Sequence, residues 1–319
     1  CASVGMVFWN QRMNMLSGNA QYIDVLERSL YNGALDGLSL SGDRFFYGNP
    51  LASNGGYGRS EWFGTACCPS NIARLVSSVG NYIYGSSANA VWVNLFIGSN
   101  TVVQQGKNKI ALAMETGYPW KGNIKLTVSP AKKSLFELRL RVPGWLTTPV
   151  PGNLYHYAEQ QNDQPTLMVN GEKADYTIDN GYAVIKRNWK KGDIVTMGLS
   201  MKVRKIASNP KIKQNTNRVA LQYGPLIYCI EGEKNILQSG NIMLPENTTF
   251  ETAYEPSLLG GVNVIRFDAP VIKVAGDGLS VSTSKQTITA IPYFTWNNRG
   301  TNDMQVWLPV RIQKIRINE

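Results

Sequence analysis

The apolar positions of this chain change their period near residue 86. Before that point they recur three and four residues apart, as in Ile23, Leu26 and Leu30, a spacing that puts side chains on one face of a helix. After it, apolar and polar residues alternate, as in Leu138 and Leu140, a pattern typical of strands with one buried face. The pattern predicts a helical part followed by a longer β-rich part.

Three helices are expected in the helical part. The first ends at Gly18, a residue suited to the left-handed conformation at a helix end, and Asn19 caps the second. The third starts at Pro69, because proline is favoured at the first helical position. The segment 37–60 is rich in Gly, Ser and Asn and is expected to form a loop and a hairpin. Three helices leave too much apolar surface uncovered to close a domain, so they should continue in residues outside this chain or pack on the β-rich part.

Short alternating runs separated by Gly, Pro and Asn turns recur through the β-rich part. They lie at 91–97, 124–128, 182–187, 194–199, 219–230, 262–267 and 305–317. About 230 residues are too many for one small sandwich, so we expect two antiparallel β-sandwiches. The predicted fold class is α+β and multidomain, divided into 1–86, 87–205 and 206–319.

Composition describes a soluble globular protein, with 43% hydrophobic and 17% charged residues. No apolar run approaches the roughly 18 residues that a membrane span requires. The formal net charge is +10, and all of the excess lies in 87–319, where the basic residues are scattered along strands. We interpret this charge as a solubility feature, since nucleic-acid binding favours a basic stripe with stacking aromatics.

No leader peptide is visible at the start of the chain. A lipoprotein would also begin with a cysteine, but Cys1 is followed at once by an apolar helix instead of a polar tether. The interpretation we prefer is a fragment cut inside a domain. The compartment stays open between a bacterial cytoplasm, where thiols remain reduced, and a periplasm.

Half of the cysteines are adjacent, because Cys67 and Cys68 directly precede Pro69. A helix N-terminus carries partial positive charge and lowers the pKa of a thiol, which favours a nucleophile or a ligand for a soft metal. Two other interpretations remain: a disulfide from Cys1 to either thiol, or burial as small core residues. Cys229 lies within an apolar strand and is expected to be a core residue.

Glu27 lies within the apolar stripe of the second helix, where a carboxylate is unusual because charged side chains are rarely buried without a partner. One hypothesis is a buried structural ion pair with Arg12 or Arg28, and the other is a functional role. The single histidine, His156, lies in a polar segment and is expected at the surface. No Ser-His-Asp triad can therefore be assembled.

Several segments of the chain resemble glycoside hydrolase family 127, which contains β-L-arabinofuranosidases and was once a domain of unknown function; the related family 146 shares its layout. The segments are 1–10, 24–32, 46–51, 62–74, 220–228 and 290–293. The resemblance implies the C-terminal part of an (α/α)6 barrel followed by two β-sandwiches. The N-terminal half of that barrel would lie outside these residues.

The same resemblance implies a zinc site and a reaction. Cys1, Cys67 and Cys68 match the thiolate ligands of a Zn²⁺ ion, whose fourth ligand is a glutamate two positions before Cys1. Cys67 matches a nucleophile that forms a glycosyl–thioether, while Glu27 and Tyr47 match positions that contact the sugar. The general acid/base is another glutamate outside this chain.

The implied function is a retaining, zinc-dependent exo-glycosidase that releases β-L-arabinofuranose from plant-type glycans. Its partners would be an arabinose-containing oligosaccharide or glycan and the missing half of the catalytic domain, with a homodimer possible. Two alternatives remain. One is a non-catalytic carbohydrate-binding or structural β-sandwich protein with disulfide or core cysteines. The other is a hydrolase of the same family that acts on a different sugar.

Overall fold

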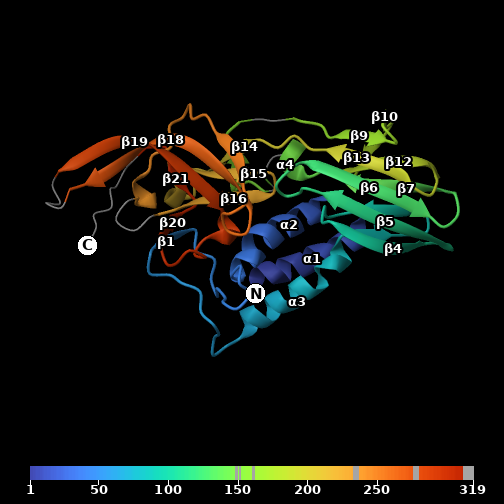
Figure 1. The fold of residues 1–319 in the computed structure, drawn as a ribbon, viewed down its shortest axis with the longest axis horizontal. Helices are drawn as coiled ribbons and strands as arrows, with labels where there is room; N and C mark the ends of the chain where they lie inside the picture. The colour runs from blue at the N-terminus through green and yellow to red at the C-terminus, as the bar shows by residue number, and fades with distance from the viewer. Residues whose placement is uncertain (148–149, 151, 160–161, 233–236, 276–279, 312–319) are drawn as a thin grey trace. The chain divides into compact units, whose positions relative to one another are not determined.

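The computed structural model describes residues 1–147, 150, 152–159, 162–232, 237–275 and 280–311 (Figure 1). Helices at the N-terminal end are followed by several largely antiparallel sheets, which confirms a mixed α+β fold. The chain forms two compact units. The first unit comprises Cys1–Leu30, Ala73–Pro149 and Gln161–Lys202, and the second comprises Tyr31–Ile72, Val150–Gln160 and Val203–Glu319. The division into 1–86, 87–205 and 206–319 stays a prediction.

Helices α1 (Ala2–Ser17) and α2 (Gln21–Ser29) open the first unit. The predicted end of α1 is confirmed, because Gly18 adopts the left-handed conformation with φ 65° and its N–H donates to the carbonyl of Asn14. The side chain of Asn19 accepts a hydrogen bond from the N–H of Gln21 at 2.9 Å, at the start of α2. Local capping signals therefore set the turn between the two helices.

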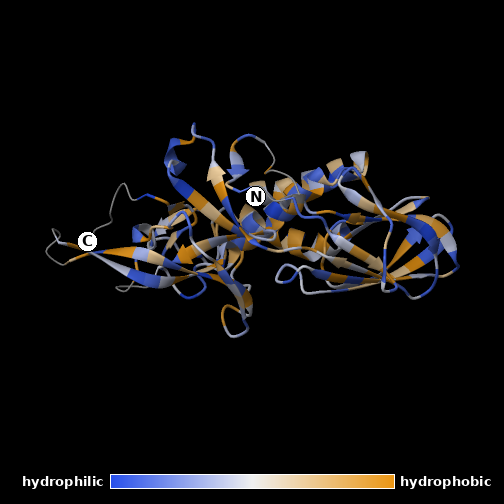
Figure 2. Cartoon of the chain, turned by 90° about the horizontal axis from the view of Figure 1, so that it is seen from above, coloured by the Kyte–Doolittle hydropathy of each residue, from blue (hydrophilic) through white to orange (hydrophobic). Residues whose placement is uncertain are grey.

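The first unit also contains a six-stranded sheet, in the order β10-β9-β13-β6-β5-β4, and a five-stranded sheet, in the order β11-β12-β7-β3-β2. Their bounds are β2 (Tyr84–Ser86), β3 (Ala90–Val93), β4 (Ser99–Gln105), β5 (Asn108–Thr116), β6 (Asn123–Pro130), β7 (Ser134–Arg141), β9 (Thr166–Val169), β10 (Glu172–Lys173), β11 (Thr177–Asp179), β12 (Tyr182–Trp189) and β13 (Asp193–Gly198). Neighbours pair antiparallel except β3 and β7, which are parallel. Hydrophobic and hydrophilic residues alternate along many of these strands (Figure 2).

The turn between α1 and α2 packs on the turn between β11 and β12. Ala20 donates its N–H to the carbonyl of Asn180 at 2.8 Å and lies in a buried cluster with Tyr182. A Cβ at Gly181 would lie 2.7 Å from the Cβ of Ala20, closer than carbon atoms approach. Gly181 also has a φ of 79°, so both the close approach and the backbone conformation require glycine.

The second unit is built on a ten-stranded sheet, in which β17-β18-β19-β16-β15-β14-β8 form the main path. Off this path, β20 pairs with β16 and with β1, and β21 pairs with β15. The bounds are β1 (Ala52–Asn54), β8 (Tyr155–Tyr157), β14 (Val203–Ser208), β15 (Arg218–Tyr223), β16 (Leu226–Glu231), β17 (Glu251–Glu255), β18 (Val262–Val274), β19 (Val281–Pro292), β20 (Asp303–Gln305) and β21 (Leu308–Pro309). Of the expected run 305–317, residues 312–317 lie outside the described residues.

The other helices of the described residues include α3 and several shorter ones. They are η1 (Leu30–Ala34), η2 (Leu35–Gly37), α3 (Cys67–Ser78), η3 (Val79–Tyr82), α4 (Gly144–Thr147), η4 (Lys213–Asn215), η5 (Ser239–Asn241) and η6 (Tyr293–Thr295). Helix α3 begins at Cys67, two residues before the predicted start at Pro69. Proline is tolerated there because the N–H groups of the first helical turn have no partner within the helix. No helix in the described part of the chain is long and apolar enough to cross a membrane.

Candidate metal and thiol site

A buried aromatic stack anchors the loop that carries Tyr47. The ring of Phe46 stacks on Tyr57 and on Trp296, with 5.0 Å between centroids in each pair. The guanidinium of Arg59 lies 4.1 Å from the centroid of the Phe46 ring. Because Phe46 is fixed in this way, the next side chain turns outward, and Tyr47 is 50% exposed.

Tyr47 meets the two adjacent thiols at the start of α3. Its hydroxyl oxygen lies 3.3 Å from Sγ of Cys67, which lies 3.9 Å from Sγ of Cys68. The hydrogen bond with Tyr47 lowers the pKa of Cys67, and the same bond raises the pKa of Tyr47. Both shifts favour a thiolate that accepts and a phenol that donates. The first turn of α3 adds partial positive charge in the same sense.

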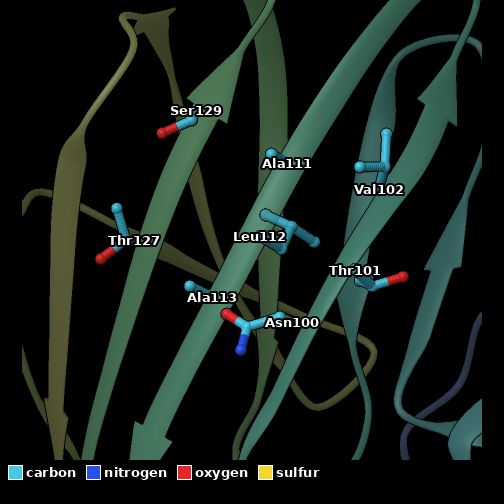
Figure 3. Close-up of a pocket in the computed structure, with 8 residues that line it drawn as sticks. All are labelled: Asn100, Thr101, Val102, Ala111, Leu112, Ala113, Thr127 and Ser129. Carbon is cyan, nitrogen blue, oxygen red and sulfur yellow. The ribbon is translucent and has the colours of Figure 1, made fainter.

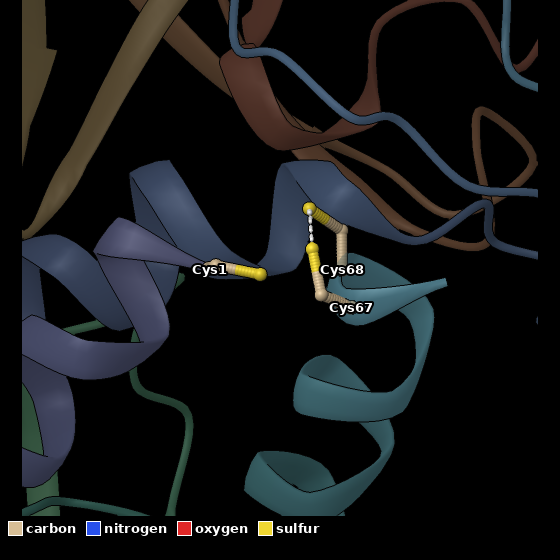
Figure 4. A group of neighbouring side chains, drawn as sticks. All are labelled: Cys1, Cys67 and Cys68. Carbon is tan, nitrogen blue, oxygen red and sulfur yellow. Dashed lines mark hydrogen bonds between the residues drawn. The ribbon is translucent and has the colours of Figure 1, made fainter. Parts of the chain in front are cut away.

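No disulfide joins any of the four cysteines, all of which lie in the described part of the chain, so the predicted alternative of a disulfide from Cys1 to Cys67 or Cys68 is wrong. Instead, the sulfur atoms of Cys67 and Cys68 are neighbours at the start of α3 (Figure 4), and Cys1 as a third metal ligand stays a prediction. Cys229 is buried in β16, as expected of a core residue, and burial raises its pKa.

The donor set fits a soft divalent metal. Two sulfurs that bind one tetrahedral zinc at about 2.3 Å lie roughly 3.8 Å apart. The separation of 3.9 Å between Cys67 and Cys68 agrees with that spacing. A lowered pKa at Cys67 also favours the deprotonated form that a metal requires.

The carboxylate of Glu27 lies in a buried charge cluster of the first unit. Its Oε1 accepts hydrogen bonds from the Arg141 guanidinium and, at 2.8 Å, from the hydroxyl of Tyr118. The other arm of Arg141 donates to Asp24 at 2.7 Å, and the Nε of Arg141 donates to the carbonyl of Asn94 at 2.7 Å. Burial raises the pKa of Glu27 and of Asp24, while the guanidinium opposes that rise.

The ion-pair hypothesis for Glu27 named the wrong partners, since the sequence pointed to Arg12 or Arg28 and the structure pairs it with Arg141. Arg141 stands in a polar position of the alternating β7 pattern, where an outward side chain is expected, yet it is 0% exposed. The only sign of Arg141 in the sequence is a charged residue in an alternating strand pattern. That pattern does not show whether the charged side chain faces the interior or the solvent.

A second buried ion pair lies in the second unit. Nη2 of Arg59 is 3.6 Å from Oδ1 of Asp36, and both side chains are buried. Arg59 also donates to the carbonyl of Trp296 at 2.7 Å. Trp296 directly follows η6, so this bond joins the loop that carries Tyr47 to the end of η6. Burial raises the pKa of Asp36 to about 7, although Arg59 opposes the rise. His156 lies in the short strand β8 and is exposed, as expected.

Three family models of one glycoside hydrolase family match successive parts of the chain. The β-L-arabinofuranosidase GH127 catalytic domain matches residues 1–81, the GH127 middle domain matches 90–201, and the family 127 C-terminal domain matches 203–309. The fold and the thiol cluster thus occur in a chain with the domain series of a glycoside hydrolase. The chain belongs to glycoside hydrolase family 127.

Several known proteins are similar to this chain. A non-reducing end β-L-arabinofuranosidase from Bifidobacterium longum is 30% identical over 96% of this chain and 48% of its own length. A solved GH127 β-arabinofuranosidase is 41% identical with a TM-score of 0.93, over 98% of this chain and 49% of its own. A solved GH127 β-L-arabinofuranosidase from Geobacillus stearothermophilus T6 is 37% identical with a TM-score of 0.86, over 97% of this chain and 49% of its own. The chain spans about half the length of these relatives.

Proposed function

We propose that this chain is part of a retaining, zinc-dependent exo-glycosidase that releases β-L-arabinofuranose from plant-type glycans. The observation that carries the proposal is the contact of Tyr47 with Cys67, 3.3 Å long, at the start of α3. It gives an accessible sulfur a lowered pKa, as a nucleophile at neutral pH needs. The similarity to GH127 arabinofuranosidases supports the sugar.

Cys1, Cys67 and Cys68 would hold the zinc ion, with a glutamate from outside these residues as fourth ligand. When bound, the metal keeps the thiols deprotonated and lowers the basicity of the nucleophile. The spacing of the two sulfurs in α3 suits this role, since 3.9 Å is the edge expected of a tetrahedral thiolate site.

In the first step the sulfur of Cys67 bonds to the anomeric carbon as the bond to the leaving oxygen breaks, and that oxygen takes a proton from a carboxylic acid outside this chain. In the second step water attacks the same carbon, the carbon–sulfur bond breaks, and the carboxylate takes the proton from the water. Two displacements retain the configuration. In the second step the sulfur is the leaving group. A hydrogen bond from the Tyr47 hydroxyl would stabilise the thiolate that forms as the carbon–sulfur bond breaks.

Glu27 and Tyr47 would orient the sugar. Oε1 of Glu27 is already engaged by Arg141 and Tyr118, so the sugar hydroxyl would bond to Oε2. The Arg141 guanidinium opposes the rise in the pKa of Glu27 that burial causes, and so favours the ionised form that accepts a hydrogen bond. Tyr47, which is 50% exposed, presents a phenol to solvent and to a ligand.

The test is zinc content together with arabinose release by the full-length protein from a β-L-arabinofuranoside. Cys67→Ser should lower release by about 10³-fold, since serine lacks a thiolate. Cys229→Ser, which changes a buried thiol far along the chain, is the control for loss of sulfur alone. Zinc-free protein with full activity, or an active Cys67→Ser variant, would refute the proposal.

A further inference from the structure

Three turns of the first unit meet at one end of its sheets. They are the turns between β4 and β5, between β6 and β7, and between β12 and β13. The side chain of Asn108 donates to the carbonyl of Lys132 at 2.8 Å, which joins the first two turns. The N–H of Gly192 donates to Oγ of Ser129 at 3.1 Å, which joins the third turn to the end of β6. Side chains on these turns are therefore neighbours in space.

These turns carry a concentration of positive charge, which we call the basic tip. Its members are Lys107, Lys109, Lys132, Lys133, Arg187, Lys190 and Lys191. The only acidic residue within 106–109, 131–134 and 187–193 is Asp193. It is buried, and its two oxygens accept from the side chain of Asn170 and from the N–H of Lys190.

None of the basic-tip side chains forms an ion pair within the described residues. Its six lysines are exposed, and the guanidinium of Arg187 lies 5.4 Å from the centroid of the Trp189 ring. The sequence predicted scattered lysines that serve solubility. The structure instead gathers seven positive charges, a large share of the net +10, at one end of one unit.

A groove on the outer face of β4, β5 and β6 leads to the basic tip. Its volume is about 380 Å³, and its lining combines apolar side chains, among them Val102 and Leu112, with hydroxyl- and amide-bearing ones (Figure 3). Ala111 and Ala113 form part of its floor, and Lys109 lies on the same face of β5 because side chains alternate along a strand. Ser129 both lines the groove and contacts Gly192 of the basic tip.

We propose that the groove and the basic tip together bind an acidic polysaccharide, a sugar polymer with carboxylates along its chain. A sugar ring would lie against the small floor of the groove, and its hydroxyls would bond to Asn100, Thr127 and Ser129. The carboxylates of neighbouring sugars would face the lysines of the tip. The choice of a glycan as partner rests on the proposed function.

Aromatic side chains argue against a nucleic acid at this surface. Single-stranded nucleic acids stack their bases on exposed aromatic rings. Phe136 and Trp189, the aromatic residues next to the basic tip in β7 and β12, are both buried. The uncharged groove beside the tip suits a sugar ring, which bonds through hydroxyl groups.

The expected binding is sensitive to salt. Single exposed lysines contribute little, so the effect comes from several acting together. Their attraction is screened over about 10 Å at 0.1 M ionic strength and about 3 Å at 1 M. Affinity for the acidic polymer should therefore fall steeply with added NaCl.

The test measures binding of de-esterified polygalacturonate to the whole protein by isothermal titration calorimetry. Fully methyl-esterified polymer, which has the same backbone without the charge, is the comparison probe. The tip variant carries Lys132→Gln, Lys133→Gln, Lys190→Gln and Lys191→Gln. The control carries Lys121→Gln, Lys211→Gln, Lys213→Gln and Lys273→Gln, an equal change of charge at exposed sites outside the tip.

We expect the tip variant to bind at least about tenfold more weakly and the control to bind like the wild type. Asn100→Ala combined with Thr127→Val should weaken binding by about threefold, and no change there would overturn the role of the groove. Equal loss in tip and control variants, or equal binding of both polymers, would overturn the proposal. So would tighter binding of single-stranded DNA by the same lysines. Binding is read without hydrolysis, so an inactive protein would refute the proposed function and leave this result intact.

Discussion

The hydroxyl of Tyr47 lies 3.3 Å from Sγ of Cys67, although the two residues are 20 positions apart in the chain. The phenol approaches from a loop held by buried aromatic rings, and the sulfur stands in the first turn of α3. This contact makes Tyr47 a residue that tunes the sulfur as well as one expected to contact sugar.

Replacement of Tyr47 by phenylalanine should raise the pKa of Cys67. The variant keeps the ring, which packs on Phe63 at 5.4 Å between centroids, and removes only the hydrogen bond that favours the thiolate. Alkylation of Cys67 by iodoacetamide, measured across pH in chelator-treated protein, should show its midpoint at higher pH. Tyr84→Phe removes a hydroxyl bonded to Ser99 and is the control. An unchanged midpoint in Tyr47→Phe would contradict the assignment.

Chelation should expose the thiol cluster. In the proposed site a bound metal would protect Cys1, Cys67 and Cys68 from a thiol reagent, so chelator should release three reactive thiols per chain. Cys229 is buried with a raised pKa and should react only after unfolding. Titration with a disulfide reagent before and after chelation checks this. Three thiols that react at the same rate with and without chelator would speak against a metal.

Removal of Arg141 should destabilise the protein severely. Arg141→Met leaves Asp24 and Glu27 buried without their cation, a change that costs about 3–5 kcal/mol. Arg139→Met, on the same strand but partly exposed, should cost at most about 1 kcal/mol. Urea denaturation of both variants measures the difference. Equal midpoints would show that the buried cluster does not support the fold.

Asp36 should make stability depend on pH. Burial raises its pKa to about 7, above the value of 3.8 expected when unfolded, so the folded state holds the proton more tightly. The free energy of unfolding should therefore fall as pH rises from about 4 to about 7. Asp36→Asn should flatten that slope, measured by thermal or urea unfolding across the same range. Asp268→Asn, at an exposed carboxylate whose pKa is lowered, should leave the slope in place.

Features encoded by neighbouring residues could be predicted from the sequence. The end of α1 at Gly18, the capping of α2 by Asn19 and the alternation in β7 each depend on a few adjacent positions. The start of α3 was placed two residues late because Pro69 also fits inside a first helical turn. The thiol pair was recognisable for the same local reason, since adjacent cysteines at a helix start are visible in the sequence itself.

The sequence by itself determined the order of helices and strands and the residue types at the thiol site, because periodicity and capping act over one or two turns. Only the tertiary structure decided that Glu27 meets Arg141, 114 residues away, and that lysines from three turns share one end of the first unit. An alternating charge looks the same whether it faces water or the interior. The ion-pair partner of such a residue depends on which distant segment packs beside it. That packing is set by the burial of apolar surface across the whole fold.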